Sequence, residues 1–232
     1  MSTVHKGAFF ESLCTRVLLR YGFHLQRKGG AGDLGIDLQG FWQVGTAQQV
    51  EHSLEAGAGR SLQWPLINLI VQCKHEKTTC KPAYIRELDG VLSRWGGADH
   101  AVSGFFLPRG LAAGHPHLHN CQHRIPLLGA ILCSSGYSAS CMTALNSSMN
   151  PMMCMVINAE GNEDQEAPDH ALWLQSRLQF CKLNQAAQRI LPHLSLAPTF
   201  ATGEAEPSLV LINEGIDITT HRLPLPKERP LQ

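Results

Sequence analysis

The sequence predicts an α/β fold with a mixed central β-sheet flanked by helices. Segments with helical and strand periodicity follow one another in the order helix, strand, strand, strand, helix, strand, which is typical of such a fold. Apolar residues make up 44% of the 232 residues and charged residues 16%, so the chain can bury a core and is not disordered as a whole. We expect a single domain over residues 1–222 and a disordered, proline-containing tail over residues 223–232.

The first predicted elements are a helix and two short strands. Apolar positions in residues 6–20 repeat at helical spacing, and Gly22 ends this helix. Alternation of apolar and polar residues predicts strands over 23–27 and 35–39, joined by a glycine-rich turn. Residues 41–64 are polar and show little periodicity, so we interpret them as a surface insertion.

The clearest buried strand follows at residues 66–72, which form a β-branched apolar run. Pro82 stands where the first turn of a helix is expected, and Gly96-Gly97 end that helix. A second insertion is predicted at about residues 108–127. The remaining expected elements are strands over 101–107, 128–133, 152–157 and 208–212 and helices over 138–147 and 170–190.

The charge of the chain is balanced but unevenly distributed. Lys and Arg total 19, as do Asp and Glu, which excludes a strongly basic protein that coats nucleic acid. Residues 1–94 carry eleven basic against eight acidic residues, whereas residues 151–232 carry six against ten. A polyanion would therefore meet the first part of the chain. No run of eighteen apolar residues occurs, so we expect no membrane partner.

Eight cysteines are present and none forms a Cys-x-x-Cys pair. Several lie in apolar segments, so we interpret most of them as buried free thiols in a reducing compartment. Histidines alternate with other residues between His115 and His123, but Pro116 interrupts them and no zinc-site spacing is present. This segment is interpreted as part of a surface insertion.

Three short pieces of sequence carry the candidate chemistry. Gln72 and Lys74 end the buried strand two residues apart, so they share one face of the sheet. Asp37 lies on the preceding strand, and Glu11 lies on the first helix. Carboxylate and amide oxygens are ligands that Mg²⁺ accepts, and a lysine can orient water or offset charge on a phosphate. The spacing alone also fits an ordinary strand that ends in a solvated lysine.

A longer sequence pattern favours the metal-site interpretation over that of an ordinary strand. The segments Phe10-Glu11, Tyr21 to Phe23, Gly29 to Leu38 and Val71 to Lys74 resemble the catalytic core of Mrr-type restriction endonucleases, within the PD-(D/E)xK nuclease-like superfamily. A closer resemblance, over most of the chain, is to the fungal mitochondrial "required for respiratory growth" proteins. It is carried by the following segments: residues 38–42, 65–74, 82–90, 130–138 and 184–187.

The resemblance implies a restriction-endonuclease-like core, a mitochondrial location and a nuclease that acts on DNA with Mg²⁺ or Mn²⁺. It implies metal ligands at Asp37, Gln72 and Glu11 and a catalytic base or water-orienting cation at Lys74. Asp33 also matches the family pattern, in the glycine-rich turn. Gln72 replaces the acidic residue of the wider superfamily, which removes one anionic ligand and weakens metal binding.

Candidate nucleic-acid contacts are Arg27, Lys28 and Arg86, whose alternative interpretation is solvated surface. An alternative function is a catalytically weak or inactive nucleic-acid-binding or scaffold protein on the same fold. The near-zero net charge and the amide at Gln72 favour this alternative. The sequence is also compatible with a homodimer.

Overall fold

The computed structural model describes residues 3–28, 35–44, 66–95, 126–158, 176–199, 208–213 and 216–217. The predicted strand over 101–107, the histidine-rich segment, the second insertion up to residue 125 and the tail over 223–232 lie outside these residues. So does the glycine-rich turn up to residue 34.

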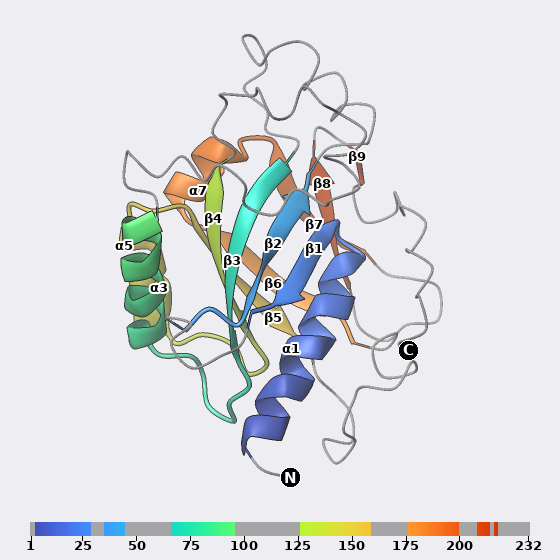
Figure 1. Ribbon diagram of the computed structural model, residues 1–232. Coiled ribbons are helices and arrows are strands. Elements are labelled where there is room, and N and C mark those ends of the chain that lie inside the picture. The colour runs from blue at the N-terminus through green and yellow to red at the C-terminus, as the bar shows by residue number, and fades with distance from the viewer. Residues whose placement is uncertain are drawn as a thin grey trace, which may run out of the picture.

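A six-stranded mixed sheet forms the centre of the fold (Figure 1). Its strands lie in chain order, with β1–β2, β2–β3 and β5–β6 antiparallel and with β3–β4 and β4–β5 parallel. The predicted mixed sheet is thereby confirmed. The strands are β1 (Phe23–Arg27), β2 (Leu38–Gln43), β3 (Leu66–Lys74), β4 (Leu127–Cys133), β5 (Met152–Ile157) and β6 (Leu178–Leu183).

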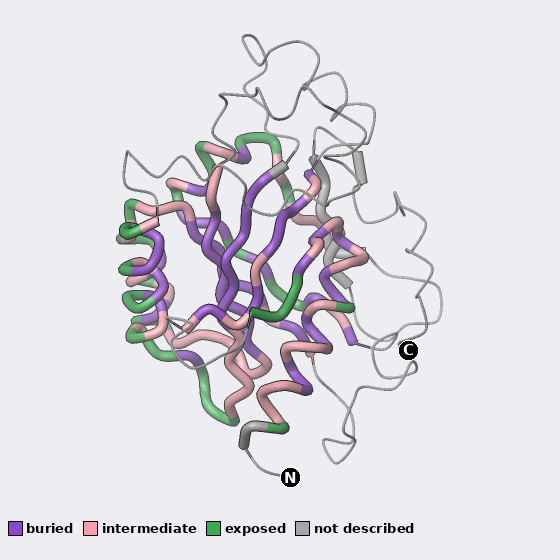
Figure 2. The backbone as a smooth tube through the Cα atoms, in the orientation of Figure 1, coloured by how far each residue is buried: buried purple, intermediate pink, exposed green. Residues whose placement is uncertain are grey.

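Helices cover both faces of this sheet. The two parallel pairs each need a crossover connection, and each of these connections carries a helix. α3 (Pro82–Trp95) links β3 to β4 and α5 (Ala139–Ser147) links β4 to β5, and these two helices pack side by side on one face (Figure 1). α1 (Thr3–Leu19) and α7 (Gln185–Ile190) contribute to the apolar cluster on the other face. Figure 2 shows the central strands buried between these layers.

A second, three-stranded antiparallel sheet follows in the chain. It consists of β7 (Leu194–Thr199), β8 (Ser208–Asn213) and β9 (Ile216–Asp217). Leu194 and Leu196 of β7 pack against the apolar cluster that contains α1. Among the described residues, no helix combines the length and the apolar character that crossing a membrane requires.

Two predicted elements differ from the structure. The second strand begins at Leu38 and continues to Gln43, because Phe41 and Trp42 pair with β3 and are buried; the first residues of the predicted insertion over 41–64 therefore belong to the sheet. The helix predicted over 170–190 is wrong in its centre. Leu178–Leu183 form β6, whose backbone pairs with β5, and only Gln185–Ile190 are helical.

Candidate functional site

Asp37 lies where β1, β2 and β3 meet. Its backbone N–H donates to the carbonyl of Val71 at 2.9 Å, and its own carbonyl accepts from the N–H of Lys28 at 2.9 Å. Its carboxylate Oδ2 accepts the backbone N–H of Cys73 at 2.6 Å. Two contacts to β3 and one to Lys28, the residue after β1, therefore fix both the backbone and the side chain of Asp37 beside the end of β3.

Gln72 directly precedes Cys73 on β3 and is buried, with an exposed fraction of 3%. Its amide packs over the turn at Gly35, where φ is +75° and where a Cβ would lie 3.1 Å from Nε2. A side chain at position 35 would thus be strained and would crowd the amide. Within the described part of the chain, Gln72 Oε1 is buried without a hydrogen-bond partner. A buried acceptor in this state is costly unless a ligand or water satisfies it.

Glu11 approaches the end of β3 from α1. Its Oε2 accepts from Arg27 Nε at 2.7 Å, with 15% of the Glu11 side chain and 52% of the Arg27 side chain exposed. Burial raises the pKa of the Cys73 thiol well above its usual range, a hydrogen bond with Cys14 adds to this, and the charges of Asp37 and Glu11 act in the same direction. Both carboxylates therefore lie close enough to Cys73 to act on one group.

Lys74 ends β3 and points toward α3. Its Nζ lies 4.6 Å from the ring centroid of Tyr84, a cation–π contact. The Tyr84 hydroxyl donates to Glu76 Oε1, and this hydrogen bond, together with partial burial, raises the pKa of Tyr84 to about 12. Sequence reasoning missed Tyr84 and Glu76. The available signals were the strand-like spacing of Lys74 and Glu76 and an aromatic residue in the first turn of the next helix.

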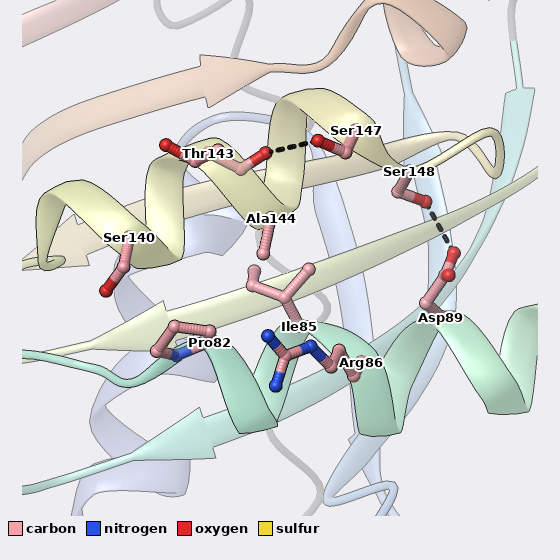
Figure 3. A pocket seen from close by; sticks show the side chains of 9 residues that line it. All are labelled: Pro82, Ile85, Arg86, Asp89, Ser140, Thr143, Ala144, Ser147 and Ser148. Carbon is pink, nitrogen blue, oxygen red and sulfur yellow. Dashed lines mark hydrogen bonds between the residues drawn. The ribbon is translucent and has the colours of Figure 1, made fainter.

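The three predicted basic contacts are held in different places. Arg27 pairs with Glu11 on α1, whereas Lys28 Nζ lies 4.7 Å from the ring centroid of Trp95 at the end of α3. Arg86 projects into a groove of about 490 Å³ between α3 and α5, opposite the hydroxyl-bearing face of α5 (Figure 3). The residues that line this groove are Pro82, Ile85, Arg86, Asp89, Ser140, Thr143, Ala144, Ser147 and Ser148.

The donor chemistry at the end of β3 fits a hard divalent cation held by few anionic ligands. The Asp37 carboxylate and the unsatisfied Gln72 Oε1 are oxygen donors, and Glu11 adds a second carboxylate from α1. In the described ranges, no group of three His, Cys, Asp or Glu residues is arranged to hold a metal.

Comparison with known proteins relates this site to one family. The model of the family described as "Required for respiratory growth protein 7" matches residues 2–104, which include all four predicted catalytic residues. An uncharacterized mitochondrial protein of Schizosaccharomyces pombe is 32% identical over 94 residues, which are 40% of this chain and 32% of the relative. The chain thus matches about a third of that relative's length.

No solved structure matches the chain. The family is named for respiratory growth and the relative is named as mitochondrial, so the two matches bear out the mitochondrial location that the resemblance implied. The segment that builds the candidate site, residues 2–104, is similar to the "Required for respiratory growth protein 7" family.

Proposed function

We propose that the protein is a Mg²⁺- or Mn²⁺-dependent endonuclease on a restriction-endonuclease-like core, and that it hydrolyses DNA phosphodiesters in mitochondria in support of genome maintenance or respiratory growth. One observation carries the proposal. The Asp37 carboxylate accepts from the backbone N–H of Cys73 near the end of β3, between Lys74 and Gln72, whose buried Oε1 has no hydrogen-bond partner among the described residues. Oxygen ligands next to a lysine are the equipment for this chemistry.

In the proposed mechanism, Asp37, Gln72 and Glu11 would hold the metal, which when bound polarises a phosphoryl oxygen and acidifies water. The Cys73 N–H orients the Asp37 carboxylate, and Gly35 leaves room for the Gln72 amide. The Lys74 ammonium orients the attacking water or offsets charge that develops on the phosphate. The Tyr84 ring, 4.6 Å from Lys74 Nζ, would limit the positions that this ammonium can take.

The test is nicking of supercoiled plasmid by the purified full chain with Mg²⁺ or Mn²⁺. We expect Asp37→Asn and Lys74→Ala each to lower the cleavage rate by about 10²-fold or more. Lys77→Ala and Glu87→Gln are matched controls, because both residues are exposed and lie outside the candidate site, so their rates should stay at the wild-type level. Cleavage that Asp37→Asn and Lys74→Ala retain would contradict the assignment of the site.

A non-catalytic nucleic-acid-binding or scaffold role is the second candidate. The pairing of Glu11 with Arg27 favours it, because that carboxylate is already engaged, and so does the amide in place of a third anionic ligand. A binder should retain a labelled DNA duplex in EDTA, lose affinity as salt rises and tolerate Lys74→Ala with little change. Light scattering on the same preparation distinguishes a monomer from the proposed homodimer.

A further inference from the structure

Arg27 and Glu11 are candidates for two different roles, yet in the structure they bind each other. Glu11 is a candidate metal ligand, and Arg27 is a candidate contact to a DNA phosphate. Arg27 Nε donates to Glu11 Oε2 at 2.7 Å, within an ion pair. While this bond persists, the guanidinium cannot give the same N–H to a phosphate, and the carboxylate cannot give the same oxygen to a cation.

The backbone of both residues is held beside the end of β3. Arg27 ends β1 and pairs there with Leu38 of β2. Phe10 precedes Glu11 on α1 and is fully buried, and its ring stacks on His75 with the ring centroids 5.0 Å apart. A change of partner would therefore move only the two side chains.

The ion pair is open to solvent on its Arg27 side. Of the Arg27 side chain 52% is exposed, against 15% of the Glu11 side chain. An ion pair with one solvated partner is weak, and salt weakens it further. A phosphate competes for the guanidinium because it accepts two hydrogen bonds from the same planar group, and a divalent cation competes for the carboxylate because it carries the larger charge.

We propose that the Arg27–Glu11 ion pair couples metal binding to DNA binding. The inference rests on the proposed function and adds the regulation of its site. A DNA phosphate that binds Arg27 releases Glu11 towards the metal, and a metal that binds Glu11 releases Arg27 towards the phosphate. Each ligand therefore raises the affinity for the other, because the ion pair has to open only once for both.

The coupling matters at this site because the site has few anionic donors. Gln72 brings an amide oxygen, so Asp37 and Glu11 are the carboxylates among the proposed ligands. Affinity for a hard divalent cation follows the charge of its ligands. While Arg27 holds Glu11, the metal meets a site with less negative charge. The ion pair thus makes tight metal binding depend on the presence of the polyanion.

The first measurement is calorimetric titration of the full chain with Mn²⁺ in the absence of DNA. Arg27→Gln removes the partner of Glu11, and we expect it to tighten Mn²⁺ binding by about twofold to fivefold. Lys28→Gln is the matched control, because it removes the same charge at the next residue, whose Nζ lies over the Trp95 ring. Equal tightening in both variants would show that general charge controls metal affinity and would overturn the proposal.

The second measurement is binding of a labelled DNA duplex in EDTA, where no metal-dependent cleavage occurs. Glu11→Gln removes the partner of Arg27, and we expect it to tighten DNA binding by about twofold to fivefold. Relative to Arg27→Gln alone, the double variant should show no such gain, because Arg27 is the group that receives the phosphate. A gain that persists in the double variant would mean that the loss of negative charge acts without the ion pair, which would contradict the coupling.

The outcomes separate the coupling from the proposed function. If the wild type binds Mn²⁺ and DNA but neither Arg27→Gln nor Glu11→Gln raises an affinity, the coupling is wrong and the proposed function is unaffected. If neither the wild type nor Arg27→Gln binds Mn²⁺, the metal site is wrong and the coupling falls with it. Circular dichroism checks that each variant is folded. Should Glu11→Gln not fold, the comparison of Arg27→Gln with Lys28→Gln still decides.

Discussion

Asn184 joins three elements at one buried point, with an exposed fraction of 1%. As the N-cap of α7, its Oδ1 accepts the N–H groups of Ala187 at 2.9 Å and Met152 at 3.1 Å. Its Nδ2 donates to three carbonyls at the end of α5 and the start of β5, those of Leu145, Ser148 and Asn150. One side chain thus satisfies backbone groups that water cannot reach.

We expect Asn184→Ala to lower the free energy of unfolding by about 3 to 5 kcal/mol, because a cap is lost and several buried groups are left unsatisfied. Ser138→Ala, which removes the N-cap of α5, is the matched control and should cost only about 1 kcal/mol. Urea unfolding of both variants checks this. Equal losses would show that the buried carbonyls find other partners.

His24 makes the stability depend on pH. It stacks on Phe41 across β1 and β2 with ring centroids 4.6 Å apart, and burial lowers its pKa from 6.5. The unfolded chain therefore takes up this proton at a higher pH than the folded chain, and the free energy of unfolding falls as pH drops below about 6.5. His24→Gln should make the loss between pH 7.5 and pH 5.5 smaller in urea unfolding. An unchanged loss would contradict the assignment.

At the residue scale, strand periodicity predicted part of the site. Gln72 and Lys74 are expected to share one face of β3. Ile70, two residues before Gln72, is buried in the cluster under α3, as this alternation along the strand requires. Periodicity could not predict the cation–π contact between Lys74 and Tyr84 or the ion pair between Glu11 and Arg27. Those contacts depend on how α3 and α1 pack on the sheet, which local spacing does not encode.

At the scale of elements, local sequence patterns predicted helices and strands correctly where only one face of the element is buried or where the segment is strongly apolar. The helix at Pro82–Trp95 and the strand at Leu127–Cys133 follow their patterns closely. β6 did not follow its pattern, because the leucines at 172, 174, 178 and 183 also fit a helix. Pairing with the exposed edge of β5 decides its conformation, and such pairing outweighs weak helix propensity.

Glycine substitutions test how tightly these elements pack. A Cβ at Gly40 of β2 would lie 1.9 Å from the backbone oxygen of His24, so the two strands would have to move apart. A Cβ at Gly90 of α3 would meet no atom within 4 Å. We expect Gly40→Ala to lower the free energy of unfolding by about 3 kcal/mol and Gly90→Ala to raise it by about 0.5 to 1 kcal/mol.

Thermal and urea unfolding of the two glycine variants measure these changes. Because the same methyl group is added in both, any general effect of alanine cancels in the comparison. A Gly40→Ala protein as stable as the wild type would mean that β1 does not lie against β2 at this register.

At the scale of the whole molecule, one sheet serves two apolar layers. Leu69 and Ile70 are neighbours on β3 and both are fully buried, but Leu69 packs in the cluster with α1 and Ile70 in the cluster with α3 and α5. Because both layers share the backbone of β3, neither can lose its packing without disturbing the sheet that supports the other. The two layers should therefore unfold together.

We expect Leu69→Ala and Ile70→Ala each to lower the free energy of unfolding by about 2 to 5 kcal/mol. Each should give one calorimetric transition at a lower temperature, and hydrogen exchange should accelerate in both α1 and α3 whichever layer carries the cavity. Val71→Ile adds volume at a third buried position and serves as a control for general perturbation of β3. Two separate transitions, or exchange that accelerates only in the helix next to the substitution, would show that the layers are independent units.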